Sequence, residues 1–346
     1  MLESFSTKAT LTKIHAKHGK MLTKQNYTEL LNKQSVSEVA EYLKKNTRYS
    51  DILANIDTHT IHRGLLETLI RRKNFDTYVE LCKFQHLDRI PFYNYEVIRE
   101  EVDQILSCIL HINANKSDDY ISTLPGYLIS HASFDMLALA KSRSFKDLLK
   151  VIRHTDYYNV LKDVTPDENG QVNYLRCEVL LRTQFYKKMF ELIDKDFDGN
   201  VAKELKRSVS IQIDMINFIN SYRLKAFFNA DVGTIKQNMF PFYGRISKKQ
   251  MFAYYEASGK EEMLDMFKKT IYARQLDEID PDIVEHNMFE IRYKAARVSL
   301  KNAQTAPVAL FSFIYLCDIE AMNIICIIEG IRYKSPPSFI EKLLII

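Results

Sequence analysis

Three features recur along this chain in the same order, with a period of roughly 110 residues. The first is a Thr-x-Tyr triplet at the end of a short amphipathic segment. It occurs at 47–49, 155–157 and 270–272. Solenoid repeats are much shorter, at about 20–50 residues per unit. The period therefore predicts three small bundles of helices related by a pseudo-threefold axis.

The second recurring feature is an acid followed three residues later by an amide, within a long apolar segment. The three pairs are Glu101/Gln104, Asp214/Asn217 and Glu320/Asn323. Residues i and i+3 share one face of a helix. A carboxylate buried there needs hydrogen-bond donors or a cation. We interpret the pairs as structural clasps for a neighbouring helix end or an arginine, with direct partner contact as the alternative. Paired-carboxylate catalysis is disfavoured because each copy supplies one acid.

The third recurring feature is a short segment that follows each acid-amide helix and ends in the first two copies with a proline-containing turn. Pro125 and Pro241 occupy equivalent places, and the third copy is truncated in the segment PSFIEKLLII. These positions divide the chain into three predicted helical repeats, over residues 1–124, 125–240 and 241–346.

The composition favours helices throughout. The 346 residues include only 9 Gly and 8 Pro, which leaves few of the tight turns that sheet-rich folds require. Apolar residues recur at helical spacing over most of the chain, and extended alternation is rare. We predict an all-α fold, with long helices over 65–84, 95–112, 204–227 and 287–303.

Residues 307–331 are long and apolar enough to be mistaken for a membrane span. Asp318, Glu320 and Asn323 lie in the middle of this segment, and each carboxylate there would cost about 2.5–3.5 kcal/mol on an insertion scale. We therefore predict a helix that is buried on most sides inside the protein.

Several classes of function are disfavoured by the sequence. The net charge is only +4, which does not indicate a nucleic-acid binder, and the phosphate-loop, dinucleotide-binding and zinc-hydrolase motifs are absent. The nearest phosphate-loop pattern, at 258–260, lacks its leading glycine. We predict no bound nucleotide, no cofactor and no catalytic site. Five cysteines without C-x-x-C spacing, and no secretory signal, favour a reducing cytoplasmic setting.

Two patterns imitate metal sites. Asp194, Asp196 and Asp198 copy the first half of an EF-hand loop, but position 12 is Leu205 rather than a carboxylate. We predict a solvated turn that caps the next helix instead of a calcium site. The histidine pairs 15/18 and 59/62 could each reach one metal ion, but neither has a third ligand nearby. We therefore predict no metal site. The basic runs 71–73 and 248–249 are expected to be solvated, with an acidic partner as the alternative.

Three stretches resemble the central-stalk (C/AC39) family of V-type rotary ATPases, whose members occur in bacterial, archaeal and vacuolar complexes. They are IDMINFINSYRLKAF with IKQNMFPFYGRIS, the segment LPGYLISHASFDMLALAKSRSFKDLLKVIRHTDYYNVL, and IEAMNIICIIEGIRYKSPPSFI. Arg223 and Lys225 fall on the family's basic positions in the first stretch, whereas Glu329 stands where a third copy of Arg223 is expected.

The resemblance implies a funnel of three bundles that acts as a mechanical adapter and not as an enzyme. Its mouth receives the axle subunits D and F, and its narrow face sits on the membrane rotor ring at the cytoplasmic face of the membrane. Torque then couples ATP hydrolysis or synthesis in other subunits to proton or sodium transport. We expect Arg223, Lys225, Arg332 and Lys334 to make polar contacts at the mouth or at helix ends. The alternatives are a free-standing helical scaffold and a calcium-responsive interaction protein built on Asp194–Asp198.

Overall fold

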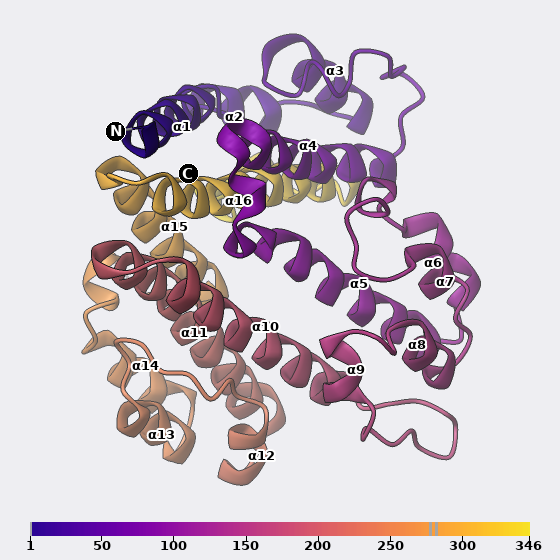
Figure 1. Cartoon of the computed structure of the whole chain (residues 1–346), viewed down its shortest axis with the longest axis vertical. Helices are drawn as coiled ribbons and strands as arrows, with labels where there is room; N and C mark the ends of the chain where they lie inside the picture. Colours follow the sequence, from indigo (N-terminus) through magenta and orange to yellow (C-terminus); the bar gives the residue numbers. More distant parts are fainter. Residues whose placement is uncertain (1, 277–278, 281–282) are drawn as a thin grey trace. The chain divides into compact units, whose positions relative to one another are not determined.

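The regular structure of this protein is helical. A computed structural model describes residues 2–276, 279–280 and 283–346, and no strand occurs among them (Figure 1). The prediction of an all-α fold is therefore confirmed. The arrangement of three bundles into a funnel stays a prediction, as do the repeat boundaries after residues 124 and 240.

The chain forms two compact units. Unit 1 contains the residues up to Leu87 together with Thr270–Ile346, and unit 2 contains Asp88–Lys269. Unit 2 is thus one continuous stretch of chain that interrupts unit 1. The first and last helices of the protein consequently fold together in unit 1.

Unit 1 is built on seven α-helices of the described chain. They are α1 (Leu2–His18), α2 (Lys24–Leu31), α3 (Val36–Asn46), α4 (Arg63–Lys83), α15 (Val284–Asn302), α16 (Ala306–Arg332) and α17 (Pro337–Lys342). Helix α16 packs against α1, α3, α4, α15 and α17, and Figure 1 shows α4 and α16 running alongside one another. Unit 1 is therefore organised around one central helix.

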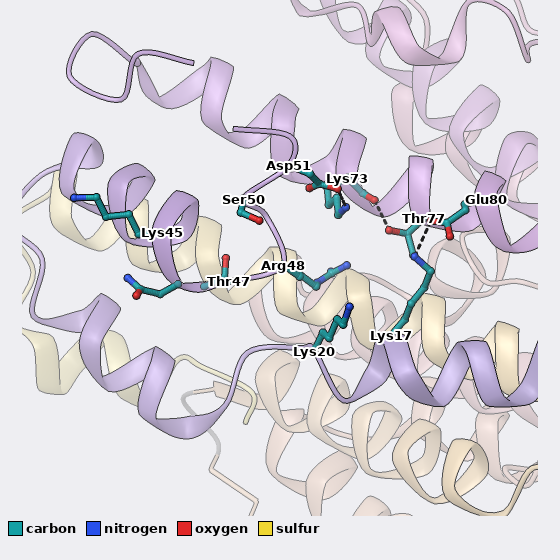
Figure 2. A pocket seen from close by; sticks show the side chains of 11 residues that line it. Lys17, Lys20, Lys45, Thr47, Arg48, Ser50, Asp51, Lys73, Thr77 and Glu80 are labelled. Atoms are coloured by element: carbon teal, nitrogen blue, oxygen red, sulfur yellow. Dashed lines mark hydrogen bonds and ion pairs between the residues drawn. The ribbon is translucent and has the colours of Figure 1, made fainter. Parts of the chain in front are cut away.

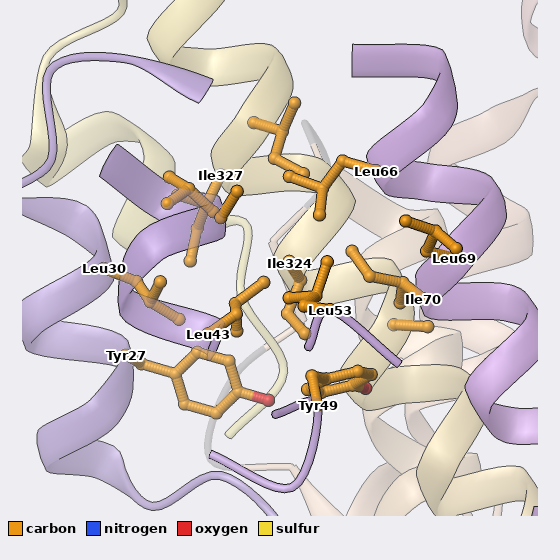
Figure 3. Close-up of a cluster of buried hydrophobic side chains, with 14 of the residues drawn as sticks. Tyr27, Leu30, Leu43, Tyr49, Leu53, Leu66, Leu69, Ile70, Ile324 and Ile327 are labelled. Carbon is orange, nitrogen blue, oxygen red and sulfur yellow. The ribbon is translucent and has the colours of Figure 1, made fainter. Parts of the chain in front are cut away.

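Helix α16 is the segment predicted to be buried. It is the one described helix whose length and composition would suit a membrane span, and 78% of its most apolar window is buried inside the protein. The prediction of a buried core helix is confirmed. Its residues Ile324, Ile327 and Ile328 pack against apolar side chains from α2, α3 and α4, including Leu30, Leu43 and Leu66 (Figure 3).

Unit 2 contains ten described α-helices, of which α5, α10 and α11 are long. They are α5 (Tyr95–Asn113), α6 (Ser117–Thr123), α7 (Met136–Ala140), α8 (Phe145–Val151), α9 (Asp156–Leu161), α10 (Tyr174–Asp196), α11 (Gly199–Phe228), α12 (Val232–Gln237), α13 (Lys248–Glu256) and α14 (Lys260–Lys268). Helix α10 packs against α5, α9 and α11, and α11 also packs against α12, α13 and α14. Short 3-10 helices connect some of these elements and those of unit 1. They are η1 (Phe84–Arg89), η2 (Pro91–Asn94), η3 (Gly126–Leu128) and η4 (Ala273–Gln275).

The predicted long helices agree with the observed α4, α5, α11 and α15 to within a few residues, apart from an early start of α11 at Gly199. Side-chain caps explain several of the observed starts. Ser35, Ser144 and Ser247 each accept a hydrogen bond from a backbone N–H in the first turn of α3, α8 and α13. Such caps satisfy donors that the helix itself leaves without a partner.

Candidate functional site

In unit 1, Glu320 lies on the buried face of α16 and is held by donors from distant segments. Its Oε1 accepts hydrogen bonds from Arg48 Nε at 2.6 Å and from the Tyr49 hydroxyl at 2.9 Å. Its Oε2 accepts one from the backbone N–H of Leu22 at 2.6 Å. The side chains of Glu320 and Arg48 are only 1% and 7% exposed, so this is a buried ion pair. Arg48 also donates to Asn74 Oδ1 at 2.8 Å.

One turn further along α16, Asn323 brackets a single backbone residue. Its Nδ2 donates to the Ile345 carbonyl at 2.7 Å, and its Oδ1 accepts from the Ile345 N–H at 3.0 Å. Both polar groups of this amide are thereby satisfied in a buried position. The bracket ties the segment after α17 to the middle of α16.

Helix α11 of unit 2 carries the same arrangement. Asp214 accepts hydrogen bonds from the backbone N–H groups of Gly244, Arg245 and Ile246, at 2.9, 2.8 and 3.1 Å. Asn217 brackets Phe240, with its Nδ2 donating to the carbonyl at 3.0 Å and its Oδ1 accepting from the N–H at 2.9 Å. The bracketed residue lies 23 positions after Asn217, and Ile345 lies 22 positions after Asn323. The two copies therefore repeat in structure as well as in sequence.

The pair on α5 differs in its amide. Glu101 accepts hydrogen bonds from the Ser133 N–H and, at 2.6 Å, from the Tyr157 hydroxyl. Gln104 does not bracket a backbone residue, and its Oε1 instead accepts from the Tyr120 hydroxyl at 3.1 Å. We refer to the acid-amide pairs on α5, α11 and α16, with the groups bonded to them, as clasps. The role of the clasps in stability or in partner contact stays a prediction.

The repeated tyrosines are partners of the repeated acids, a pairing that was not predicted from the sequence. Tyr157 donates a hydrogen bond to Glu101, the repeated acid that precedes it in the sequence. Tyr49 precedes all three acids and donates to the last of them, Glu320. Tyr272 is also buried, at 1% exposure. Burial raises the pKa of Tyr49 well above its ordinary value, so its hydroxyl remains a donor at neutral pH. The recurrence of Thr-x-Tyr was the sequence signal from which this pairing of tyrosines with acids could have been predicted.

Each of the three clasp helices is followed within two residues by a residue in the left-handed region that is not glycine. These residues are Asn115, Asn229 and Lys334, with φ of 55°, 45° and 55°. Asparagine tolerates this conformation, whereas a lysine there is uncommon. The N–H of Ser335, which follows Lys334, donates back to the Gly330 carbonyl at 2.9 Å and closes α16. The helix end therefore presents the Lys334 side chain to solvent.

The four predicted basic contacts lie on or just past the clasp helices, two in each unit. Arg223 is exposed on α11, and Lys225 donates to the Tyr255 carbonyl at 3.2 Å. Arg332 is exposed, with its guanidinium over the Tyr333 ring and 3.8 Å from Glu329. Glu329 itself pairs with Arg63 at 2.5 Å. Lys225 therefore has a structural contact, whereas the side chains of Arg332 and Lys334 are exposed.

The acids of the half EF-hand pattern make contacts within the protein. Asp196 accepts a hydrogen bond from the Phe92 N–H at 2.7 Å and so caps η2, and Asp194 pairs with Lys206. Asp198 is the N-cap residue of α11, but its side chain makes no capping hydrogen bond. The turn therefore supplies the N-cap residue of α11, as predicted, but without a capping hydrogen bond from its side chain, and Asp196 instead binds η2.

The two histidine pairs are also accounted for. His15, His18 and His59 are exposed, and His62 caps α4 by accepting from the Leu65 N–H at 3.2 Å. Within the part of the chain that the structure describes, no group of three His, Cys, Asp or Glu side chains could hold a metal ion.

Curated proteins with similar sequences are the C subunits of A-type ATP synthases. The chain is 22% identical to that of Methanosphaera stadtmanae over 216 residues, 23% identical to that of Methanosarcina mazei over 231 residues, and 24% identical to that of a Desulfurococcus species over 216 residues. Each match covers 62% of this chain and 53%, 58% and 56% of the respective relative. The chain thus spans little more than half the length of these relatives.

The family comparison extends further along the chain. The sequence profile described as ATP synthase (C/AC39) subunit matches residues 10–343, which include α2 to α17 and the acid-amide pairs of all three clasps. The chain therefore belongs to the ATP synthase (C/AC39) subunit family.

Proposed function

We propose that this protein is a non-catalytic central-stalk adapter of a rotary ATPase or ATP synthase. It couples the D–F axle to the membrane rotor ring, and so couples ATP hydrolysis or synthesis to proton or sodium transport. The observation that carries the proposal is the family match over residues 10–343. The protein would act at the cytoplasmic face of the membrane as a peripheral part of the complex.

The clasps support a mechanical role. An adapter under torque must resist the sliding of helices past one another, and loops are the most deformable connections in a helical protein. Asp214 and Asn217 fix the loop after α12 to the middle of α11, through five hydrogen bonds to backbone groups of residues 240 and 244–246. Asn323 does the same for the segment after α17. Stiffness between helices is what torque transmission requires.

The same hydrogen bonds disfavour a catalytic role for the clasp acids. A general acid or base must reach the proton of a substrate. Asp214 accepts three backbone hydrogen bonds and is fully buried, and Glu320 accepts three hydrogen bonds at 1% side-chain exposure. Their oxygens are therefore already engaged, and the chemistry of ATP is assigned to other subunits.

Binding to the axle provides the test. The purified chain is mixed with the D–F pair from the same organism at low salt and micromolar concentration, and analysed by size-exclusion chromatography. We expect a stable one-to-one-to-one complex. If the three proteins do not co-elute, the adapter proposal is contradicted.

A charge-reversal pair then tests the contact residues. Arg332→Glu/Lys334→Glu is expected to weaken axle binding at low salt by about tenfold or more, because rim charges steer and align partners. The matched control is Lys248→Glu/Lys249→Glu, two exposed lysines at the start of α13. Equal binding by both variants would remove Arg332 and Lys334 from the contact while leaving the adapter role intact.

A further inference from the structure

Unit 1 contains a pocket of about 650 Å³ with a basic lining. It lies between α1, the end of α3, the turn after α3, and α4. Five of its lining residues are cationic and two are acidic. The cations are Lys17, Lys20, Lys45, Arg48 and Lys73, and the acids are Asp51 and Glu80. We call this cavity the basic pocket, and its lining carries an excess of positive charge.

The two acids of the basic pocket are each matched by lysines. Glu80 pairs with Lys17 at 2.7 Å and with Lys13 at 2.9 Å, and Asp51 pairs with Lys73. Burial raises the pKa of Glu80, but hydrogen bonds from Lys17 and Lys13 outweigh burial and hold that pKa below its ordinary value. Glu80 is therefore ionised at neutral pH, and the lining acids leave positive charge in excess.

One cation of the lining has no acidic partner in the described part of the chain. Among the residues that the structure describes, none pairs with the ammonium group of Lys20. Figure 2 shows Lys20 directed toward Arg48, with Lys17 on the same side and Lys73 and Asp51 on the opposite side. Lys45 points away from Arg48 in this view and pairs with Glu41 at 2.5 Å. The excess positive charge therefore lies at Lys20 and at Lys17, which shares Glu80 with Lys13, whereas the charge of Arg48 is balanced by Glu320.

Lys17 and Lys20 line the same cavity, and a bound anion would relieve the repulsion between their charges. Arg48 cannot turn away, because its side chain is 7% exposed and is bonded to Glu320 and Asn74. Its side chain, paired with Glu320, thus forms a fixed polar part of the lining. Ser50 is exposed on the lining of the same cavity and offers a hydroxyl donor.

The size of the basic pocket favours a small molecule over a macromolecular segment. Its volume falls within the range of about 300–1,000 Å³ that is typical of small-ligand sites. Lysines contributed by separate elements bind phosphate groups as point charges. Several phosphates in a chain would match several cations spread around one cavity.

We propose that the basic pocket binds a chain of phosphate groups through Lys17, Lys20 and Ser50, beside the fixed side chain of Arg48. The chain can be a free oligophosphate or the phosphate portion of a nucleotide. This inference does not depend on the axle or the rotor ring. Because Arg48 also bonds Glu320, a ligand in the pocket lies next to the clasp of unit 1 and is expected to stabilise that unit.

Titration calorimetry of the full chain tests the proposal, with tripolyphosphate and ATP as separate ligands in magnesium-free, phosphate-free buffer at low salt. We expect one-to-one binding of tripolyphosphate. The variant Lys17→Gln/Lys20→Gln keeps Lys13 as a partner of Glu80, so it should still fold. It is expected to bind at least about tenfold more weakly, because both charge-assisted hydrogen bonds to the phosphates are lost. The control Lys248→Gln/Lys249→Gln should bind like the parent protein.

The source of the phosphates follows from the two ligands. Equal affinity for tripolyphosphate and ATP indicates a site for free oligophosphate, and tighter binding of ATP that still depends on Lys17 and Lys20 indicates a nucleotide; both outcomes support the proposal. It is overturned if tripolyphosphate does not bind at millimolar concentration, or if the two double variants lose affinity equally. Binding of hexaglutamate as tightly as tripolyphosphate would also overturn it, in favour of an acidic peptide.

Discussion

Glu320 illustrates how a single buried carboxylate is made tolerable in this protein. Removing an ionised group from water costs several kcal/mol, and a buried ion pair repays that cost only when the remaining polar groups are also bonded. Here Glu320 Oε1 accepts hydrogen bonds from Arg48 and Tyr49, and Oε2 accepts one from the Leu22 N–H. The arrangement therefore depends on every partner being present.

Glu320→Gln should be strongly destabilising. The substitution keeps the size of the side chain but leaves the Arg48 charge buried without a counter-charge. We expect a loss of about 3–5 kcal/mol in the free energy of unfolding of unit 1. Urea denaturation followed by circular dichroism measures it.

Two comparisons make the Glu320 measurement specific. Glu341→Gln changes an exposed acid on α17 and should alter stability by less than about 0.5 kcal/mol. Adding Arg48→Met to Glu320→Gln should recover part of the loss, because no unpaired charge then remains buried. A loss under about 1 kcal/mol for Glu320→Gln alone would show that this clasp acts no more strongly than a surface ion pair.

At the scale of elements, the clasp of α11 requires the loop after α12 to approach the helix very closely. A Cβ atom on residue 244 would lie 2.6 Å from Asp214 Oδ2 and 2.8 Å from Ser210 Cβ. Only a glycine fits at that distance without a shift of the loop or the helix. The approach is what brings three successive N–H groups within reach of one carboxylate.

Gly244→Ala should therefore weaken unit 2 by about 1–3 kcal/mol, through overpacking at Asp214. Gly126→Ala is the matched control, because a Cβ at residue 126 meets no heavy atom within 4 Å. Thermal unfolding of both variants checks this. A similar change in melting temperature for the two would mean that the close approach at Gly244 is not what limits packing there.

The elements themselves were largely predictable, whereas the partners of the clasps were not. Apolar spacing located α4, α5 and α15 to within a few residues at either end. The recurring acids and amides marked the buried positions. Their partners include the backbone N–H groups of Leu22 and Ser133, and a backbone donor carries no signature of residue type. The cap of α4 was missed for a related reason, since histidine is not among the preferred capping residues.

On the scale of the molecule, unit 1 is assembled from segments at opposite ends of the sequence. Glu320 and Asn323 reach back to Leu22, Arg48 and Tyr49, and forward to Ile345. A period in the sequence shows that the repeated features exist, but it does not show which repeat contacts which in the folded protein. The sequence could therefore not predict that the last acid pairs with the first tyrosine.

If the two units open independently, damage to one clasp should remain within its own unit. Asn323→Ala is expected to accelerate amide hydrogen exchange in α2 and in residues 343–345, and to leave α10 unchanged. Asn217→Ala should do the reverse, with faster exchange over residues 239–246 and no change in α2. Hydrogen exchange with mass spectrometry measures both. Faster exchange across both units in either variant would mean that they unfold as one.

The discontinuity of unit 1 also affects how the protein is made. During synthesis, Arg48 cannot form its ion pair until Glu320 has been added, and Glu320 lies 272 residues later in the chain. At a synthesis rate of about 5–20 residues per second, this delay is roughly 15–55 seconds. All of unit 2 emerges from the ribosome in the interval, while the apolar faces of α3 and α4 still lack α16. The apolar side chains of α3 and α4 therefore remain exposed throughout this interval, before they are buried in one core with those of α16.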